Sequence, residues 1–158
     1  MERYKIAALY ADGQELDGQT VTVCGWAKNI RDSKNIGFIA LSDGGCFKTL
    51  QVVFEASKLA NYEEVAHAGL YTSMRVTGRL VLTPQAKQPL EVKAASIQVE
   101  GSSTPDYPLQ KKRHTVEYLR TIAHLRPRTN LFSAVFRVRS VAAYAIHQIG
   151  RASCRERV

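Results

Sequence analysis

Hydrophobic and polar residues alternate with a period of two along several short segments of the first hundred residues. In segment 19–30, Val21, Val23, Gly25 and Ala27 alternate with a second set of residues, which is the pattern of a strand with one buried face. Further β-rich segments span 36–43, 49–54, 70–82 and 90–99. Between the third and fourth of these strands, segment 56–68 has apolar residues near helical spacing.

The predicted order of elements is β-β-β-α-β-β, with Asp43-Gly44-Gly45 as the turn of a hairpin. This order fits an all-β, five-stranded, partly open barrel of the oligonucleotide/oligosaccharide-binding (OB) type. We therefore expect residues 1–100 to form one OB-fold domain.

The rest of the chain has a different pattern, typical of a linker followed by α-helices. Gly, Ser and Pro are frequent in 101–112, which we expect to be a linker or hinge. In 113–148, Thr115 is positioned to cap a short helix, Pro127 interrupts it, and Thr129 or Asn130 is positioned to cap a longer one. That longer helix has an apolar stripe with no local partner, formed by Leu131, Val135, Val138, Ala142 and Ala145. The stripe predicts contact with a neighbouring domain or a second subunit.

The charge of the chain is concentrated in its second part. The sequence has 22 Lys and Arg against 14 Asp and Glu, a formal net charge of +8. Residues 1–100 contain 11 basic and 11 acidic residues, whereas 101–158 contain 11 basic and 3 acidic ones. A basic segment of this kind is typical either of phosphate contact or of a solvated helix face, and charge alone leaves both open.

Several function classes are disfavoured by composition. No apolar run approaches the length of about 18 residues that a membrane-spanning helix needs, and the N-terminus lacks the apolar stretch of a signal peptide. Three cysteines without metal-ligand spacing predict neither a disulfide framework nor a zinc site and favour the cytoplasm. We expect no bound metal, no cofactor and no membrane partner for this chain.

The final segment, 149–158, resembles a translated sequencing adapter. Its residues, Ile-Gly-Arg-Ala-Ser-Cys-Arg-Glu-Arg-Val, follow one reading frame of such an adapter without a mismatch. We therefore expect this segment to be a non-native tail and exclude it from functional interpretation.

A candidate nucleic-acid site lies on the second and third predicted strands. Phe38 offers a ring for base stacking, Arg31 a planar cation, and Gln51 an amide that can pair with the edge of a base. Spacing alone favours a structural role, with Phe38 in the core, Gln51 facing solvent and Arg31 as a turn charge. Trp26 is predicted to be a packing residue of the first strand.

Residues 1–147 resemble the N-terminal part of the bacterial-type asparaginyl-tRNA synthetases, which are class II enzymes. Anticodon-binding barrels of the asparaginyl, aspartyl and lysyl enzymes share the motifs Val23-Cys24-Gly25-Trp26, Arg31-Asp32-Ser33-Lys34, Phe38 with Asp43-Gly44, and Gln51. The asparaginyl branch is indicated by Tyr107-Pro108, Lys112-Arg113-His114 and the run from His124 to Asn130. Phe136-Arg137-Val138-Arg139-Ser140 is similar to the start of class II motif 1.

This resemblance implies that Arg31, Phe38 and Gln51 hold the middle anticodon base, a uridine, and that Glu91 lies near the first base. It implies tRNA(Asn) as the partner and, in the full-length parent, a homodimer through the helix at 129–147 and the use of ATP and Mg²⁺ to join asparagine to tRNA. Class II motifs 2 and 3 are missing here, so we expect 113–148 to be a truncated start of the catalytic domain. We expect no catalytic residues and no activity in this chain.

Two other interpretations of the sequence stay open. One is an OB module that binds single-stranded nucleic acid without sequence preference. The other is a dimerising fragment whose contact with nucleic acid is incidental. The apolar stripe on the last helix disfavours the first of these, because a module that needs only a groove has no use for it.

Overall fold

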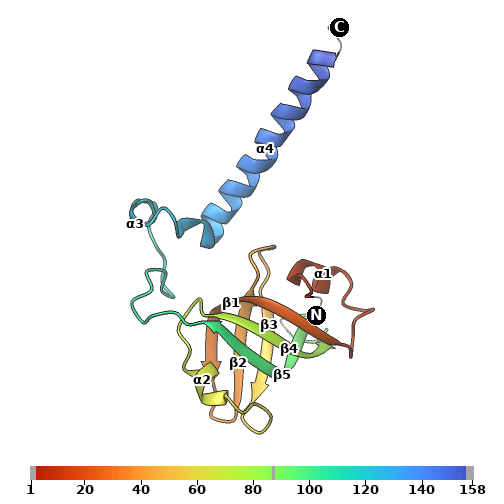
Figure 1. Ribbon diagram of the computed structural model, residues 1–158, viewed down its shortest axis with the longest axis vertical. Coiled ribbons are helices and arrows are strands. Elements are labelled where there is room, and N and C mark those ends of the chain that lie inside the picture. The colour runs from red at the N-terminus through yellow and green to blue at the C-terminus, as the bar shows by residue number, and fades with distance from the viewer. Residues whose placement is uncertain (1–2, 87, 156–158) are drawn as a thin grey trace. The chain divides into compact units, whose positions relative to one another are not determined.

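The computed structural model describes residues 3–86 and 88–155, with side chains described as far as residue 150. The chain forms two compact units, which divide between Tyr107 and Pro108 (Figure 1). This division falls within the segment 101–112 that the sequence indicates as a linker. The two units are described separately.

The first unit is a closed five-stranded barrel. Its strands are β1 (Thr20–Asp32), β2 (Ile36–Ser42), β3 (Leu50–Glu55), β4 (Ser73–Leu82) and β5 (Leu90–Gly101). They close in the order β1-β2-β3-β5-β4, with β3 and β5 parallel and every other neighbouring pair antiparallel. The helix α2 (Tyr62–Ala66) lies between β3 and β4 in the chain, so the predicted OB fold and its order of elements are confirmed.

Strand β1 is long enough to pair with two neighbours. Its first half, from Thr20 to Trp26, pairs with β4, and its second half, from Trp26 to Asp32, pairs with β2. A β-bulge interrupts the second ladder, because Ala27 pairs with Leu41 while Asn29 pairs with Ala40. The extra residue shifts the alternation of side chains, so that Trp26 before the bulge and Asn29 after it lie on the same outer face.

The core fills the inside of the barrel with alternate residues of each strand. Val23, Ile39, Val52, Val76 and Val92 come from the five different strands and are fully buried. A further helix that the sequence does not predict, α1 (Ile6–Ala11), adds the buried side chains of Ile6 and Leu9 to this core. The helix expected over 56–68 is wrong in extent, since only Tyr62–Ala66 is helical and turns precede it.

One close approach inside the barrel requires a glycine. Gly37 on β2 pairs with Phe54 on β3, and the Phe54 ring lies over the Gly37 backbone. A Cβ atom at position 37 would lie 2.1 Å from Phe54 Cζ, far inside van der Waals contact. The ring also packs against Tyr62 of α2, at 5.1 Å between centroids. Gly37 therefore lets a large aromatic side chain close this part of the core.

The described part of the second unit, residues 108–155, contains three helical segments. In α3 (Val116–Thr121), Thr115 Oγ1 accepts a hydrogen bond from the Tyr118 N–H at 3.2 Å, which confirms the predicted cap. A 3₁₀ turn, η1 (Arg126–Arg128), contains Pro127, and α4 (Asn130–Arg155) follows. Thr129 Oγ1 accepts from the Phe132 N–H at 3.4 Å, which confirms a cap at this position too.

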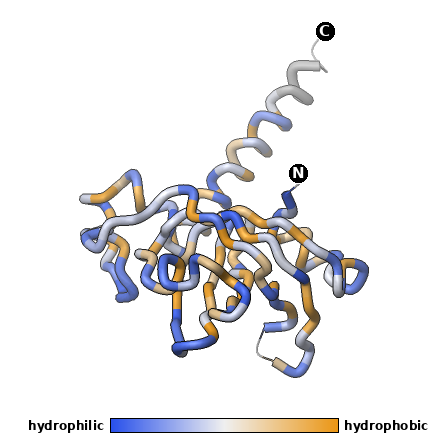
Figure 2. Tube along the Cα trace, turned by 60° about the horizontal axis from the view of Figure 1, so that its bottom comes forward, coloured by the Kyte–Doolittle hydropathy of each residue, from blue (hydrophilic) through white to orange (hydrophobic). Residues whose placement is uncertain are grey.

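The apolar side chains of α4 are largely open to solvent. Val138, Val141 and Tyr144 are 69%, 70% and 65% exposed, and Leu131 and Val135 are 55% and 47% exposed. Hydrophobic and hydrophilic residues alternate along the helix in Figure 2. Near its start, the Arg126 guanidinium lies over the rings of Phe132 and Phe136, at 4.9 and 5.5 Å from their centroids. Within the part of the chain that the structure describes, no helix is long and apolar enough to cross a membrane.

Candidate nucleic-acid interface

The outer surface of β1, β2, β3 and β5 carries two neighbouring rows of side chains. Each row crosses the four strands because the residues are directly paired in the sheet. We call the two rows together the recognition face. The first row is Arg31, Phe38, Val53 and Lys93, and the second is Asn29, Ala40, Gln51 and Glu91.

All four residues that the sequence indicated for the site lie on this face. Arg31 is exposed and pairs directly with half-buried Phe38, while Gln51 pairs with half-buried Glu91. Arg31, Phe38 and Gln51 line one small hollow together with Ala40 on β2. The hollow has a volume of about 20 Å³, which is room for about one water molecule, so a planar base would lie over Phe38 and Gln51 on the open face of the sheet.

A hydrogen bond orients the amide of Gln51. Its Nε2 donates to Glu91 Oε2 across the parallel pair of β3 and β5, at 3.3 Å. With one N–H of Nε2 directed to this carboxylate, the amide presents Oε1 as an acceptor and the second N–H as a donor. Glu91 therefore both faces the site and holds Gln51 in one orientation.

Two polar residues of the hollow were not predicted from the sequence. Asn29 comes from β1 and Gln88 from the loop between β4 and β5. Within the described ranges, Asn29 Oδ1 and Gln88 Oε1 are buried side-chain oxygens without a hydrogen-bond partner. Buried acceptors are normally paired in folded proteins, so these two are suited to accept hydrogen bonds from a ligand. The short Pro-rich stretch before β5 carries no sequence signal for such a role.

Charge on the recognition face is mixed rather than uniformly basic. Arg31 and Lys93 are exposed cations at the two ends of the first row, and Glu91 ends the second row. At the bulge of β1, burial lowers the pKa of the Lys28 ammonium below its usual value. Mixed charge with amide groups suits recognition of base edges better than general attraction to phosphate.

The structure does not support a packing role for Trp26. Its side chain is 41% exposed on the outer face of β1, so that prediction is wrong. The alternation along β1 explains the position, since Val23, Gly25 and Ala27 point inward and Trp26 lies between two of them. Among the residues that the structure describes, no group of three His, Cys, Asp or Glu side chains is arranged to hold a metal ion.

Comparison of the sequence and comparison of the fold with known proteins lead to the same group of proteins. Residues 21–100 match the family of OB-fold nucleic acid binding domains. The asparagine–tRNA ligases of Bacillus cereus and Acetivibrio thermocellus are 59% and 56% identical to this chain over 148 residues, which are 94% of this chain and 32% of each relative. The asparaginyl-tRNA synthetase of Pyrococcus horikoshii, complexed with asparaginyl-adenylate, has a similar fold with a TM-score of 0.81 at 21% identity, over 94% of this chain and 34% of that one.

The chain belongs to the family of OB-fold nucleic acid binding domains. Within that family it is similar to the N-terminal OB region of bacterial asparagine–tRNA ligases, which confirms the resemblance drawn from the motifs. It spans about a third of the length of those relatives.

Proposed function

We propose that this chain is the anticodon-recognising part of an asparagine–tRNA ligase and that its recognition face binds the anticodon loop of tRNA(Asn). The observation that carries the proposal is the recognition face itself, on which Arg31, Phe38, Gln51 and Glu91 are neighbours on paired strands. The high identity to asparagine–tRNA ligases supports the choice of tRNA.

The middle base of the anticodon lies over Phe38, with its edge at the small hollow that Gln51 lines. Phe38 stacks on the base, which is worth about 1–3 kcal/mol and is independent of base identity. Discrimination comes from Gln51, because Oε1 accepts a hydrogen bond from N3–H of uracil while the remaining N–H donates to a uracil carbonyl. Cytosine has no hydrogen at N3, so its N3 faces Oε1 acceptor to acceptor. Arg31 adds a cation at the edge of the same hollow.

Glu91 is the residue for the first base. A carboxylate accepts two hydrogen bonds, and the Watson–Crick edge of guanine offers N1–H and N2–H as neighbouring donors. Glu91 shares its carboxylate with Gln51, so the two subsites are adjacent on β3 and β5. The pair favours a guanine followed by a uracil, as in the anticodon GUU.

The full-length enzyme would perform the chemistry in the two thirds of its length that this chain does not span. There, ATP and Mg²⁺ would serve the activation of asparagine and its transfer to tRNA. Contact between two copies through the exposed apolar residues of α4, in the range 129–147, would form the homodimer. The place of action would be the cytoplasm, where tRNA is charged.

The test is binding of the full 158-residue chain to an anticodon stem-loop with GUU and to the same stem-loop with GCU, each at two salt concentrations. We expect a preference for GUU of about tenfold, or about 1.4 kcal/mol, that persists at the higher salt concentration. Phe38→Ala should weaken binding to both RNAs, whereas Gln51→Ala should mainly remove the preference between them.

A matched control separates recognition of bases from attraction to phosphate. Lys111→Ala with Lys112→Ala removes two exposed cations outside the barrel and should leave the preference for GUU unchanged. Equal affinity for GUU and GCU that falls steeply with salt would contradict the proposal. It would favour the alternative of an OB module that binds single strands without sequence preference.

A further inference from the structure

The ladder between β1 and β2 continues beyond the recognition face in the direction of Trp26. Along this ladder the outward pairs are Arg31 with Phe38, then Asn29 with Ala40, and next Trp26 with Ser42. Phe38 and Ser42 are four residues apart on β2, which corresponds to roughly 13 Å along a strand. The indole is therefore the next outward aromatic group on the same strand pair.

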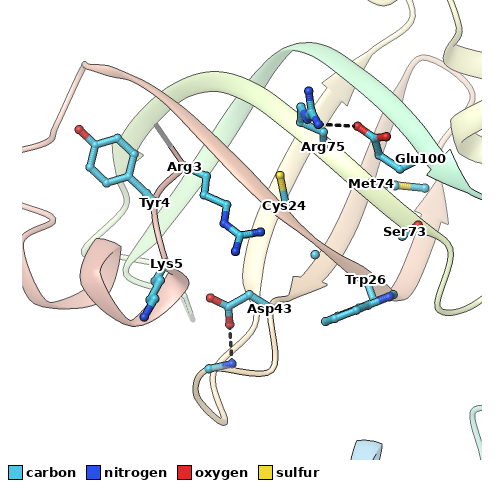
Figure 3. Close-up of a pocket in the computed structure, with 12 residues that line it drawn as sticks. Arg3, Tyr4, Lys5, Cys24, Trp26, Asp43, Ser73, Met74, Arg75 and Glu100 are labelled. Carbon is cyan, nitrogen blue, oxygen red and sulfur yellow. Dashed lines mark hydrogen bonds and ion pairs between the residues drawn. The ribbon is translucent and has the colours of Figure 1, made fainter. Parts of the chain in front are cut away.

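Trp26 lies in a groove with a cavity volume of about 500 Å³ (Figure 3). Cys24, Trp26 and Met74 give the groove an apolar wall, and the segment before α1 forms another side. Cavities of about 300–1,000 Å³ with apolar walls and a few polar groups are typical of sites for small molecules or parts of larger ligands. The volume is sufficient for one nucleotide.

The charges around this groove favour an anion. Three cations line it, Arg3, Lys5 and Arg75, against two carboxylates, Asp43 and Glu100. Glu100 pairs with Arg75 at 3.0 Å. Both oxygens of Asp43 accept backbone hydrogen bonds at 2.8 Å, from the N–H groups of Ile6 and Gly45. Because Asp43 keeps its charge, the three cations and two carboxylates leave the groove with a net charge of +1, and the exposed Arg3 and Lys5 side chains supply it from the segment before α1.

We infer that this groove is a second RNA subsite, in which a nucleotide outside the anticodon triplet stacks on Trp26 while Arg3 and Lys5 contact its phosphate. The inference rests on the proposed function. An OB fold accommodates about 4–16 nucleotides, so three bases do not use its full capacity. Aromatic stacking beside cations is the usual combination in sites for single-stranded nucleic acid.

The order of the subsites along the RNA determines whether Trp26 receives a nucleotide on the 5′ or the 3′ side of the triplet. The first base is assigned to Glu91 on β5 and the middle base to Gln51 and Phe38 on β3 and β2, so the strand runs from β5 towards β1. Trp26 lies farther along the β1–β2 ladder than Arg31 and Asn29, roughly 13 Å from the middle-base position, so the third base fits between them and the nucleotide on the 3′ side of the triplet reaches the indole.

Trp26 is the single tryptophan of the chain, so its fluorescence reports directly on the groove. The full chain is titrated with the GUU stem-loop and with the same stem-loop carrying an abasic site directly 3′ of the triplet. We expect the intact RNA to quench the emission at saturation. The abasic RNA should bind about tenfold more weakly and leave the emission near its free value.

Substitutions in the groove test which side chains contact the RNA. Trp26→Ala should weaken binding of the intact RNA about tenfold, and Trp26→Phe should recover most of the loss because a ring is restored. Arg3→Ala with Lys5→Ala should make the negative slope of log K for RNA binding against log salt concentration shallower by about one. The Lys111→Ala, Lys112→Ala control should leave the quenching of Trp26 fluorescence unchanged. Thermal unfolding of each variant checks that the barrel is intact.

The two proposals fail in different ways. Trp26 emission that stays constant at saturating RNA, or equal affinity of Trp26→Ala and the unchanged chain, would overturn the second subsite even when GUU is preferred over GCU. Loss of that preference, with Phe38→Ala binding as well as the unchanged chain, would overturn the proposed function. If saturating intact RNA still quenches Trp26 fluorescence in the Phe38→Ala variant, this supports the second subsite.

Discussion

Apolar residues of the same type are buried in the barrel and exposed in the helical unit. In the barrel, Val76 and Val92 are completely buried, whereas Val138 and Val141 in α4 are 69% and 70% exposed. Contacts in the barrel also join distant parts of the sequence, such as the hydrogen bond from Tyr62 to Asp32, 30 residues apart. In α4 the corresponding side-chain bond, from Gln148 to Tyr144, spans four residues. The barrel is stabilised by its own core, and the helix has an apolar surface that a partner would have to cover.

The largest expected difference between the two units is in backbone hydrogen exchange. Amides of the barrel should exchange by global unfolding, while those of α4 should exchange by local opening, because an isolated helix is marginally stable in water. We expect protection over 15–100 to exceed that over 112–147 by roughly four thousandfold, a ratio set by a barrel stability of about 5 kcal/mol. Mass spectrometry of the exchanging chain measures this, and uniform protection throughout would show that the helical unit is stabilised in the free chain.

Two glycines offer a matched comparison with opposite expected outcomes. Gly37→Ala places a Cβ 2.1 Å from Phe54 Cζ and should destabilise the barrel by about 3 kcal/mol, because the ring must leave its position. Gly150→Ala in α4 meets no atom within 4 Å and should raise helix content without changing barrel unfolding. Urea unfolding followed by Trp26 fluorescence, with circular dichroism for helix content, measures both effects.

A second substitution tests the cause assigned to Gly37. In Phe54→Leu the ring is absent, so adding Gly37→Ala should cost much less than it costs alongside Phe54. A double-mutant cycle gives this difference as a coupling energy. Additive costs would show that the close approach of the ring is not what requires glycine at position 37.

A valine buried in the barrel and a valine exposed on α4 should respond differently to truncation. Val76→Ala should lower the free energy of unfolding of the barrel by about 2 kcal/mol, from lost burial and the cavity that remains. Val141→Ala removes the same atoms from an exposed position and should change it by less than about 0.5 kcal/mol. A large effect of Val141→Ala on barrel unfolding would mean that α4 contributes to the stability of the barrel in solution.

The strands were predictable from the sequence because a two-residue period is a local property of the chain. The helix α1 was not, since its six residues depend for their burial on Ile6 and Leu9 reaching the barrel core. The site residues also divide into those that follow the local two-residue period and those that do not. Phe38, Gln51 and Glu91 keep the regular alternation of their strands, whereas the bulge between Ala27 and Asn29 moves Asn29 to the outer face against the simple alternation. Gln88 enters the hollow from a loop, where no period applies.

The smallest expected effect is an alkaline step in stability that belongs to the barrel. Tyr62 donates a hydrogen bond to Asp32 Oδ1, and this bond, followed by burial and the negative charge of Asp32, raises the pKa of the Tyr62 phenol from 10.0 to about 12. A group whose pKa is raised in the folded state stabilises that state below its unfolded pKa and loses this contribution as pH rises through its folded pKa. The stabilisation should therefore be complete below pH 10 and disappear by about pH 12.

Tyr62→Phe isolates this contribution from the other groups that titrate at alkaline pH. The variant keeps the ring beside Phe54 and lacks the hydroxyl, so it should be less stable than the unchanged chain at pH 8, and the difference should shrink between pH 10 and 12. Tyr144→Phe is the matched control in α4, where the hydroxyl accepts from Gln148 within one helical turn, and it should leave barrel unfolding unchanged at every pH. A difference for Tyr62→Phe that stays constant from pH 8 to 12 would mean that the hydroxyl acts through packing, not through a bond that requires its proton. A difference that shrinks would show that a bond between residues 30 apart contributes to the barrel's stability, a kind of contact that the local bond within α4 does not provide.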